Sequence, residues 1–228
     1  MKSTFLPIAL SFIFLILYTQ TFAQRFRGGI SAGLVTTDVG GDDPRDYDND
    51  FHKAGFVFGG FVTTPINEKS SLQFELNVIQ KGTLQSADSN GIGYYKLALD
   101  YLEIPVIFKR RLNLNFSKRK VNGFDIQAGV SVGKIFQSTI EGDNIAQNPD
   151  MGFLKKTDLS ILMGIDYEFS DHFNFCLRYS NSVIRVFKND YFPIGSYYNP
   201  LGPFNNGNNL VFHFIFQYTF GIAKNIVG

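Results

Sequence analysis

One segment near the end of the chain, Leu210 to Phe220, alternates large apolar residues with residues that are mostly polar or smaller. The apolar positions recur with a period of two, at Leu210, Phe212, Phe214, Phe216, Tyr218 and Phe220. Successive side chains of a strand point to opposite faces, so one face of this strand is an unbroken apolar and aromatic wall. A strand that separates lipid from the lumen of a barrel has this pattern.

The first residues of the chain have the composition of a secretory signal peptide. Lys2 provides a positive charge, residues 5–18 are almost wholly apolar, and Thr21 and Ala23 are small residues of the kind that a signal peptidase recognises. We expect a cleaved signal peptide at 1–23, export by the Sec route, and a domain at 24–228. The alternative is a retained membrane helix, for which the apolar run is short and lacks charged stop-transfer flanks.

The remaining sequence contains eight segments that are typical of strands, at 27–35, 53–62, 71–79, 95–110, 123–137, 157–169, 173–187 and 209–220. Their connections alternate in length, with short ones at 63–70 and 170–172 and long polar ones at 36–52, 80–94, 138–156 and 188–208. Outer-membrane barrels have short periplasmic turns and longer external loops. The basic segment 111–122 is the exception, and we expect it to extend its hairpin into the periplasm.

No other segment is long and apolar enough to be a candidate transmembrane helix. Lipid satisfies no backbone hydrogen bonds, so a chain that crosses a membrane with strands must close them into a barrel. The sequence therefore predicts an all-β fold, an eight-stranded antiparallel up-and-down transmembrane β-barrel in the outer membrane of a Gram-negative cell. A soluble barrel or sandwich is the alternative.

The volume of the lumen decides which face of each strand points outward. The interior of an eight-stranded barrel is only just wide enough to be filled by side chains, and the apolar faces carry too many large residues to share it. We therefore predict that the lipid-facing residues include Phe74, Ile104, Phe108, Phe124, Ile161, Phe175, Phe212, Phe214, Phe216, Tyr218 and Phe220. The charged residues on the opposite faces are Arg27, Glu75, Glu103, Asp125, Asp166, Glu168 and Arg178. Isolated ions are costly in a narrow interior, so we expect an ion-pair network around Arg27 and Arg178, with Lys109, water or protons balancing the excess of acids.

The stretch Tyr101-Leu102-Glu103-Ile104-Pro105 resembles a sequence found in small outer-membrane barrel proteins of the Bacteroidetes, often called PorT-like. Residues 28–34, 128–136 and 163–180 are also similar to that family. The resemblance implies an eight-stranded outer-membrane barrel but no single activity, and no catalytic residue set comes with it. The founding member of the family is associated with protein export by the type IX secretion route. The chain departs from the usual barrel-insertion signal, because G-I-A-K-N-I-V-G follows Phe220.

The residues that could carry chemistry are few and scattered. Cys176 is the only cysteine, and the histidines (His52, His172 and His213) lie at neither metal-ligand nor catalytic spacing. We therefore predict no catalytic residues, no cofactor site, no metal site and no enzymatic activity. The aspartates of the first long loop lack the glycine and the closing glutamate of a calcium loop, so a solvated acidic loop is expected, with surface calcium as the alternative.

The expected partners are outer-membrane lipid, lipopolysaccharide and a periplasmic or secretion-machinery protein. A formal net charge of +1 gives no footprint for nucleic acid, which we exclude. The basic run over 109–120 is either a solvated hairpin or a contact for anionic headgroups or a periplasmic partner. The aromatic segment 191–209 is expected to cap the barrel, and contact with a ligand or partner is the alternative. We predict a structural or assembly factor linked to secretion; the alternatives are a narrow channel or small-solute transporter and a lipid-modifying enzyme.

Overall fold

The computed structural model describes residues 26–40, 53–85, 94–116, 119–142, 152, 154–188 and 207–220. The predicted signal peptide, the acidic residues of the first long loop from Asp42 on, and most of the aromatic segment 191–209 lie outside the described residues. In the part of the chain that is described, no helix has the length and apolarity needed to cross a membrane.

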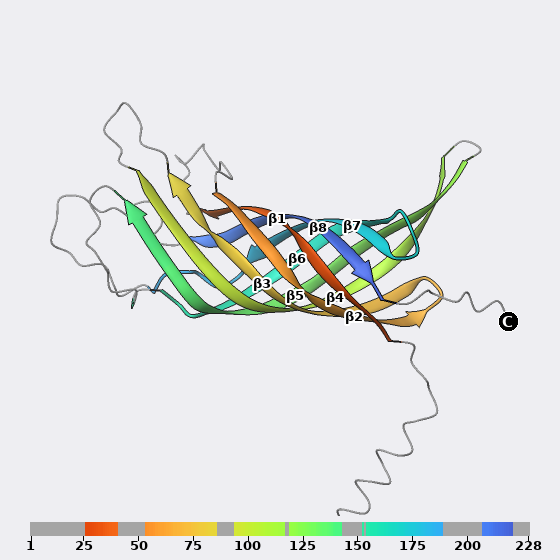
Figure 1. The fold of residues 1–228 in the computed structure, drawn as a ribbon, viewed down its shortest axis with the longest axis horizontal. Coiled ribbons are helices and arrows are strands. Elements are labelled where there is room, and N and C mark those ends of the chain that lie inside the picture. Colours follow the sequence, from red (N-terminus) through yellow and green to blue (C-terminus); the bar gives the residue numbers. More distant parts are fainter. Residues whose placement is uncertain are drawn as a thin grey trace, which may run out of the picture.

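The described residues form eight strands that close into one barrel, which confirms the predicted fold (Figure 1). Each strand pairs in antiparallel fashion with the next along the chain, and the last pairs with the first. The strands are β1 Arg27–Gly40, β2 Lys53–Asn67, β3 Ser70–Gln85, β4 Tyr95–Phe116, β5 Arg119–Gly142, β6 Thr157–Glu168, β7 Phe173–Ser182 and β8 Asn208–Thr219.

The two ends of the barrel differ in their connections. At one end, which we call the turn end, β2 joins β3, β4 joins β5 and β6 joins β7 through a few residues, and β1 begins there. At the other end, the loop end, all four connections are long. The β4–β5 hairpin extends well beyond the rest of the barrel at the turn end, so segment 111–122 lengthens its hairpin as expected (Figure 1).

Several strand ends differ from the predicted ones. β1 and β3 continue past Val35 and Ile79 because their later residues keep alternating between the two faces, with Thr37, Val39, Lys81 and Thr83 buried in the lumen. Thr37 is fully buried and its hydroxyl donates to the Gly82 carbonyl at 2.7 Å, while Lys81 is fully buried beside it. β7 ends at Ser182, five residues before its predicted end, because residues 183–187 turn across the barrel opening.

The outer surface of the barrel is covered by apolar side chains. In β8, Phe212, Phe214 and Phe216 are 41%, 43% and 58% exposed, whereas the intervening residues are at most 4% exposed. Phe74, Ile104, Phe108, Ile161 and Phe220 are likewise exposed. The other three predicted lipid-facing residues are partly covered by neighbouring rings: Phe124 lies 4.7 Å from Tyr167, Phe175 lies 5.1 Å from Phe216, and Tyr218 lies 5.0 Å from Phe173 (centroid distances).

Burial shows which residues of β2 face outward and which face the lumen. Phe56 and Phe58 are exposed on the outside, and Val57 and Phe61 are buried in the lumen. Glycine makes room for the inward Phe61: a Cβ atom on Gly29 would lie 2.3 Å from its ring. Small residues on the lumen face thus allow a few large ones to enter, as the limited volume requires.

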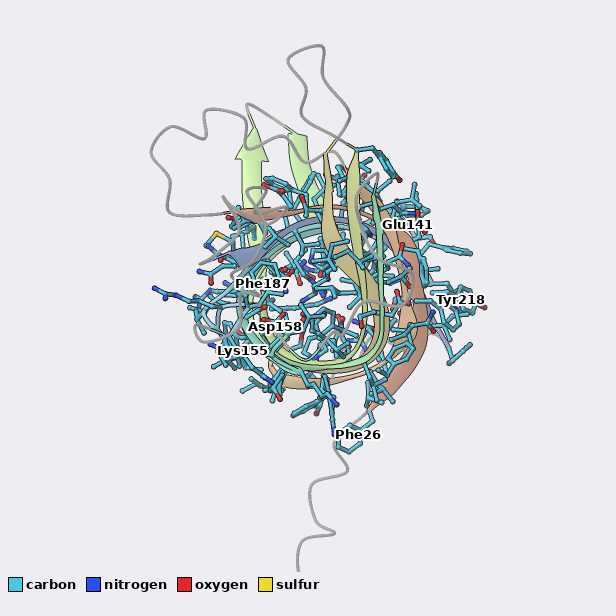
Figure 2. The ribbon with its side chains drawn as sticks, turned by 90° about the vertical axis from the view of Figure 1, so that its left-hand side faces the viewer. Phe26, Glu141, Lys155, Asp158, Phe187 and Tyr218 are labelled. Atoms are coloured by element: carbon cyan, nitrogen blue, oxygen red, sulfur yellow. The ribbon has the colours of Figure 1, made fainter. Side chains whose placement is uncertain are left out.

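The lumen is not polar throughout. Towards the loop end it holds an apolar plug whose members include Val35, Leu97, Leu99 and Val211. Leu154 and Phe187, joined by an isolated antiparallel bridge, complete this plug. Phe187 and Asp158 both lie inside the ring of strands, whereas Tyr218 lies outside it (Figure 2). Burial of these side chains closes the loop end by the hydrophobic effect.

A charged substitution tests the outer surface. Phe214 lies midway along β8, so Phe214→Arg would place a cation near the centre of the apolar band and lower the free energy of unfolding by about 2–4 kcal/mol. Phe220→Arg, at the turn end of the same face, would cost about 0–1 kcal/mol. Equilibrium denaturant unfolding in phospholipid vesicles measures both values. Equal losses for the two variants would contradict a lipid-facing surface.

Candidate functional site

The centre of the lumen is crossed by a bidentate ion pair between Glu75 of β3 and Arg178 of β7. The Nη1 and Nη2 atoms of Arg178 donate to the two carboxylate oxygens at 3.0 and 2.8 Å. Gln73 and Asn77 donate to the same carboxylate at 2.6 and 2.8 Å, and all four side chains are buried. β3 and β7 are not neighbours in the barrel, so this pair links opposite walls.

A second cluster lies between this pair and the apolar plug. The fully buried Lys81 ammonium is 2.9 Å from Asp158 of β6 and 3.4 Å from Glu103 of β4. The hydroxyls of Ser160 and Ser182 donate to Asp158, and that of Ser131 donates to Glu103. The cluster holds two carboxylates for one ammonium, and the three hydroxyl donors satisfy the additional acceptor atoms.

Two further groups of charges lie towards the turn end. Lys109 of β4 is 2.6 Å from Asp166 of β6, and it donates to Gln217 at 3.3 Å. Arg111 donates from Nε to Asp125 of β5 and from Nη2 to Glu168 of β6 at 2.5 Å. Gln127 connects the Lys109–Asp166 pair to the Glu75–Arg178 pair. Its amide oxygen accepts from Arg178 at 3.3 Å, and its amide nitrogen donates to Asp166 at 3.2 Å. The lumen therefore contains four groups of buried and half-buried ions stacked along its length, and hydrogen bonds through Gln127 join two of them.

Six of the seven charged residues that the sequence assigns to the lumen take part in these pairs. The exception is Arg27, which lies at the turn-end mouth and forms no ion pair with another described residue. Lys81, Asp158 and Arg111 take part in these pairs but were not predicted to do so. The strand predicted at 71–79 stops before Lys81, no role was predicted for Asp158, and Arg111 falls in the basic run expected to be a solvated hairpin or a contact for anionic headgroups or a periplasmic partner. Continued alternation beyond Ile79 is the signal that could have identified Lys81.

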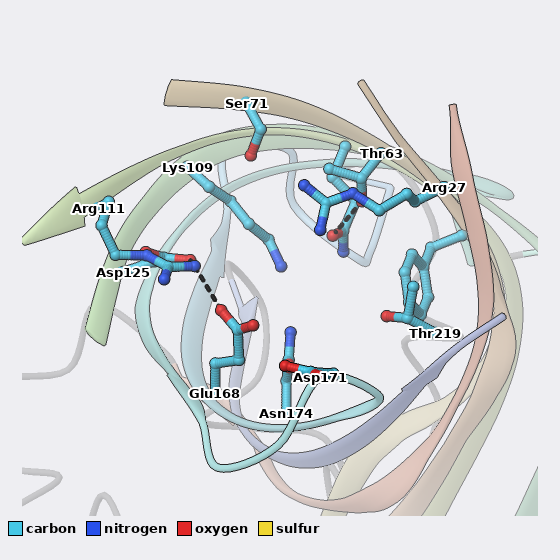
Figure 3. Close-up of a pocket in the computed structure, with 12 residues that line it drawn as sticks. Arg27, Thr63, Ser71, Lys109, Arg111, Asp125, Glu168, Asp171, Asn174 and Thr219 are labelled. Atoms are coloured by element: carbon cyan, nitrogen blue, oxygen red, sulfur yellow. Dashed lines mark hydrogen bonds and ion pairs between the residues drawn. The ribbon is translucent and has the colours of Figure 1, made fainter. Parts of the chain in front are cut away.

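The turn end of the lumen opens into a polar pocket (Figure 3). Lys109 projects into it, the Arg111–Asp125–Glu168 group forms one side, and Arg27 lies on the other. Thr63, Ser71, Gln73, Asp171, Asn174 and Thr219 also line it. Its cations and carboxylates are interspersed, so the pocket favours neither anions nor cations by charge alone, and its depth is limited by the paired ions above it.

A serine and a histidine meet in the lumen, although no serine is close to His213 along its own strand. The Ser180 hydroxyl of β7 lies 2.9 Å from Nε2 of His213, because Arg178 is paired with His213 and Ser180 is two residues further along. Nδ1 of His213 has no hydrogen-bond partner among the described residues, so the orienting acid of a catalytic triad is absent from this part of the chain. No group of three potential metal ligands occurs among the described residues either.

The loss of stability on breaking the Glu75–Arg178 pair tests whether the lumen charges brace the barrel. Arg178→Met would leave the Glu75 carboxylate buried without its cation and lower the free energy of unfolding by about 3–5 kcal/mol. Adding Glu75→Leu to that variant would recover much of the loss, because no uncompensated charge would remain. Denaturant unfolding of both variants measures the difference.

The control is Lys96→Met, which removes one partner of the exposed Lys96–Glu141 pair at 3.2 Å. Exposed ion pairs contribute about 0–1 kcal/mol, so this variant should unfold almost like the wild type. A loss for Arg178→Met no larger than that of the control would contradict the bracing role of the lumen charges.

A family described as "Outer membrane protein beta-barrel domain" matches residues 18–188. Comparison with curated proteins gave no match. Among solved structures, the chain is similar to Ail, the attachment invasion locus protein of Yersinia pestis, in complex with the heparin analogue sucrose octasulfate (TM-score 0.44, 11% identity, 86% of this chain and 99% of that one). It is also similar to Neisserial surface protein A (0.44, 12%, 86% and 97%) and to OprG from Pseudomonas aeruginosa (0.31, 14%, 86% and 94%).

The family match spans most of the sequence, including β1 to β7. Together with a closed barrel whose outer surface is apolar, it accounts for both the fold and the location of the protein. The chain therefore belongs to the outer membrane protein β-barrel domain family and resides in the outer membrane of Gram-negative cells.

Proposed function

We propose that the chain is a non-enzymatic outer-membrane barrel of the PorT-like group of the Bacteroidetes, which acts as an assembly or interaction factor linked to protein secretion. The observation that carries this proposal is the filled lumen, in which buried ion pairs join opposite walls beneath an apolar plug. Because the side chains of the interior pair with one another across the barrel, the surfaces at its two ends are the ones available to bind a partner protein.

The stretch that resembles the PorT-like group supports a structural role for the lumen. Tyr101, Glu103 and Pro105 face inward, while Leu102 and Ile104 are exposed on the outside. The Tyr101 ring lies 5.0 Å from the Lys81 ammonium and its hydroxyl accepts from Asn209 at 3.2 Å. Glu103 pairs with the same lysine. Tyr101 and Glu103 thus help to hold the cluster of Lys81, Asp158 and Glu103 together.

The surface proposed to contact a periplasmic partner is the projecting β4–β5 hairpin, because short-turn ends of outer-membrane barrels face the periplasm. The basic run at its base is divided differently from the expectation. Lys109 and Arg111 turn into the lumen and pair with carboxylates, so they are not part of a solvated face. Arg110 is exposed, and Lys118, Arg119 and Lys120 lie in the sequence between the end of β4 and the first residues of β5. These four residues are the proposed contact for an acidic partner.

Affinity purification from cross-linked envelopes tests this role. The tagged wild-type protein should recover secretion-machinery subunits, and replacing Arg110, Lys118, Arg119 and Lys120 by glutamine should reduce that recovery by on the order of tenfold, because complementary charges across an interface steer and select partners. Lys69→Gln, at the exposed β2–β3 turn, is the matched control and should recover the subunits normally. Recovery of no envelope protein by the wild type would refute an interaction role.

Conductance distinguishes this proposal from a channel. Because an eight-stranded interior is filled by side chains, the wild-type protein in a planar bilayer should show conductance near zero. Discrete open steps that persist at neutral pH would favour the narrow-channel alternative instead. The outcome is independent of whether a secretion partner is recovered.

A further inference from the structure

We propose that a cluster of cations at the loop end, formed by Lys134, Lys155, Lys156 and Arg185 and called here the basic rim, binds the phosphate groups of lipopolysaccharide. The site is separate from the lumen and from the periplasmic hairpin. It depends on the outer-membrane location and not on the secretion role, so the two proposals can fail independently.

Backbone pairing joins the three segments that carry the basic rim, one after another, at the loop end. Lys134 of β5 is paired with Thr157 at the start of β6, and the Ile135 N–H donates to the Lys156 carbonyl at 2.8 Å. The Lys155 N–H donates to the Val186 carbonyl at 2.8 Å, next to the Leu154–Phe187 bridge. Arg185 directly precedes Val186, so it lies beside Lys155 in the segment that carries Phe187 into the plug.

The length of β5 places Lys134 at the height of the membrane–water interface. Phe124, which packs on Tyr167, is the first outward side chain described on β5, and Lys134 follows ten residues later on the same face. With about 3.3 Å per residue and a strand tilt of about 40°, that separation corresponds to roughly 25 Å along the membrane normal. Barrel apolar bands are about 25 Å tall, so Lys134 stands at their external edge.

The immediate neighbours of Lys134 suit a lipid with a charged head. On the outer face it follows Val130 and Val132, both 51% exposed, and it is paired with the exposed Leu102 of β4. Phe136, the next outward residue, is 59% exposed, as expected for an aromatic side chain at the interface. Acyl chains could therefore cover the valines while the phosphate meets the ammonium above them.

The rim has no acidic partner among the described residues. Asp158, the nearest carboxylate in sequence, is buried in the lumen and paired with Lys81, and Glu141 is paired with Lys96. Glu141 and Lys155 lie on opposite sides of the barrel when it is viewed end-on (Figure 2). Clustered like charges repel, and this repulsion is relieved when an anion binds between them.

Lipopolysaccharide fits this combination of features better than a soluble anion does. Its lipid A carries phosphates at the level of the external interface, directly above acyl chains, and the loop end of an outer-membrane barrel faces that leaflet. A free anion would gain nothing from the exposed valines and leucine beneath the rim. Each rim cation near an anionic lipid surface strengthens the attraction, which falls off within a Debye length.

Binding of purified lipid A to the folded protein in non-ionic detergent tests the proposal. The wild type should bind lipid A with both phosphates at least tenfold more tightly than dephosphorylated lipid A or phosphatidylglycerol. The variant Lys134→Gln, Lys156→Gln, Arg185→Gln should lose on the order of tenfold or more of that affinity, since three interfacial charges are removed. Lys96→Gln, a loop-end cation that already has an acidic partner, should bind like the wild type.

Three results would overturn the proposal. They are unchanged affinity in the folded triple variant, equal binding of dephosphorylated lipid A by the wild type, and equal competition by phosphatidylglycerol. Heat-dependent migration on gels reports whether each variant is folded. If the triple variant fails to fold, Lys134→Gln with Lys156→Gln, which changes only exposed side chains, replaces it and should show a loss of at least severalfold.

Discussion

The hydrogen-bonded pairing of β1 with β8 is the contact on which the rest of the structure depends. It runs from Gly29 opposite Thr219 to Gly40 opposite Asn208 and removes the last free strand edges within the barrel wall. Lipid offers no partner for an open edge, so only the closed sheet can occupy a membrane. Closure gives each strand an outer face and a lumen face. The alternation of Phe212, Phe214 and Phe216 with smaller or polar residues then places the rings against lipid and the other side chains in the lumen.

The lumen created by closure is narrow, and its charges must be neutralised by side chains from other strands. Glu75 with Arg178 and Lys81 with Asp158 join strands that are not adjacent in the sheet. Buried ion pairs are poor sources of net stability, because desolvation offsets much of their attraction. Their value here is geometric: they restrain opposite walls that no ladder hydrogen bond connects, while the plug around Leu154 and Phe187 supplies the apolar burial.

The sequence alone predicts the strand number, the antiparallel order and the two faces, because these depend on local alternation. It does not predict which lumen charges meet, because that depends on the relative register of strands far apart in the chain. Arg27 was expected within the network, but its position at the first residue of β1 leaves it at the mouth. Lys81 and Arg111 were assigned to connections because apolar alternation stops before them, although polar alternation continues.

The cationic side chains of the chain lie in two different environments, the lumen and the rim at the loop end, although the net charge is close to zero. In the lumen, Lys81, Lys109 and Arg178 each have a carboxylate within 3.4 Å, as a low-dielectric interior requires. At the rim, where water hydrates the head of a long side chain, Lys134 and Lys156 need no such partner. An unpaired cation at an interface is therefore inexpensive to keep and available to an external anion. Recognition by this barrel is for that reason expected at its rims, and rigidity within its lumen.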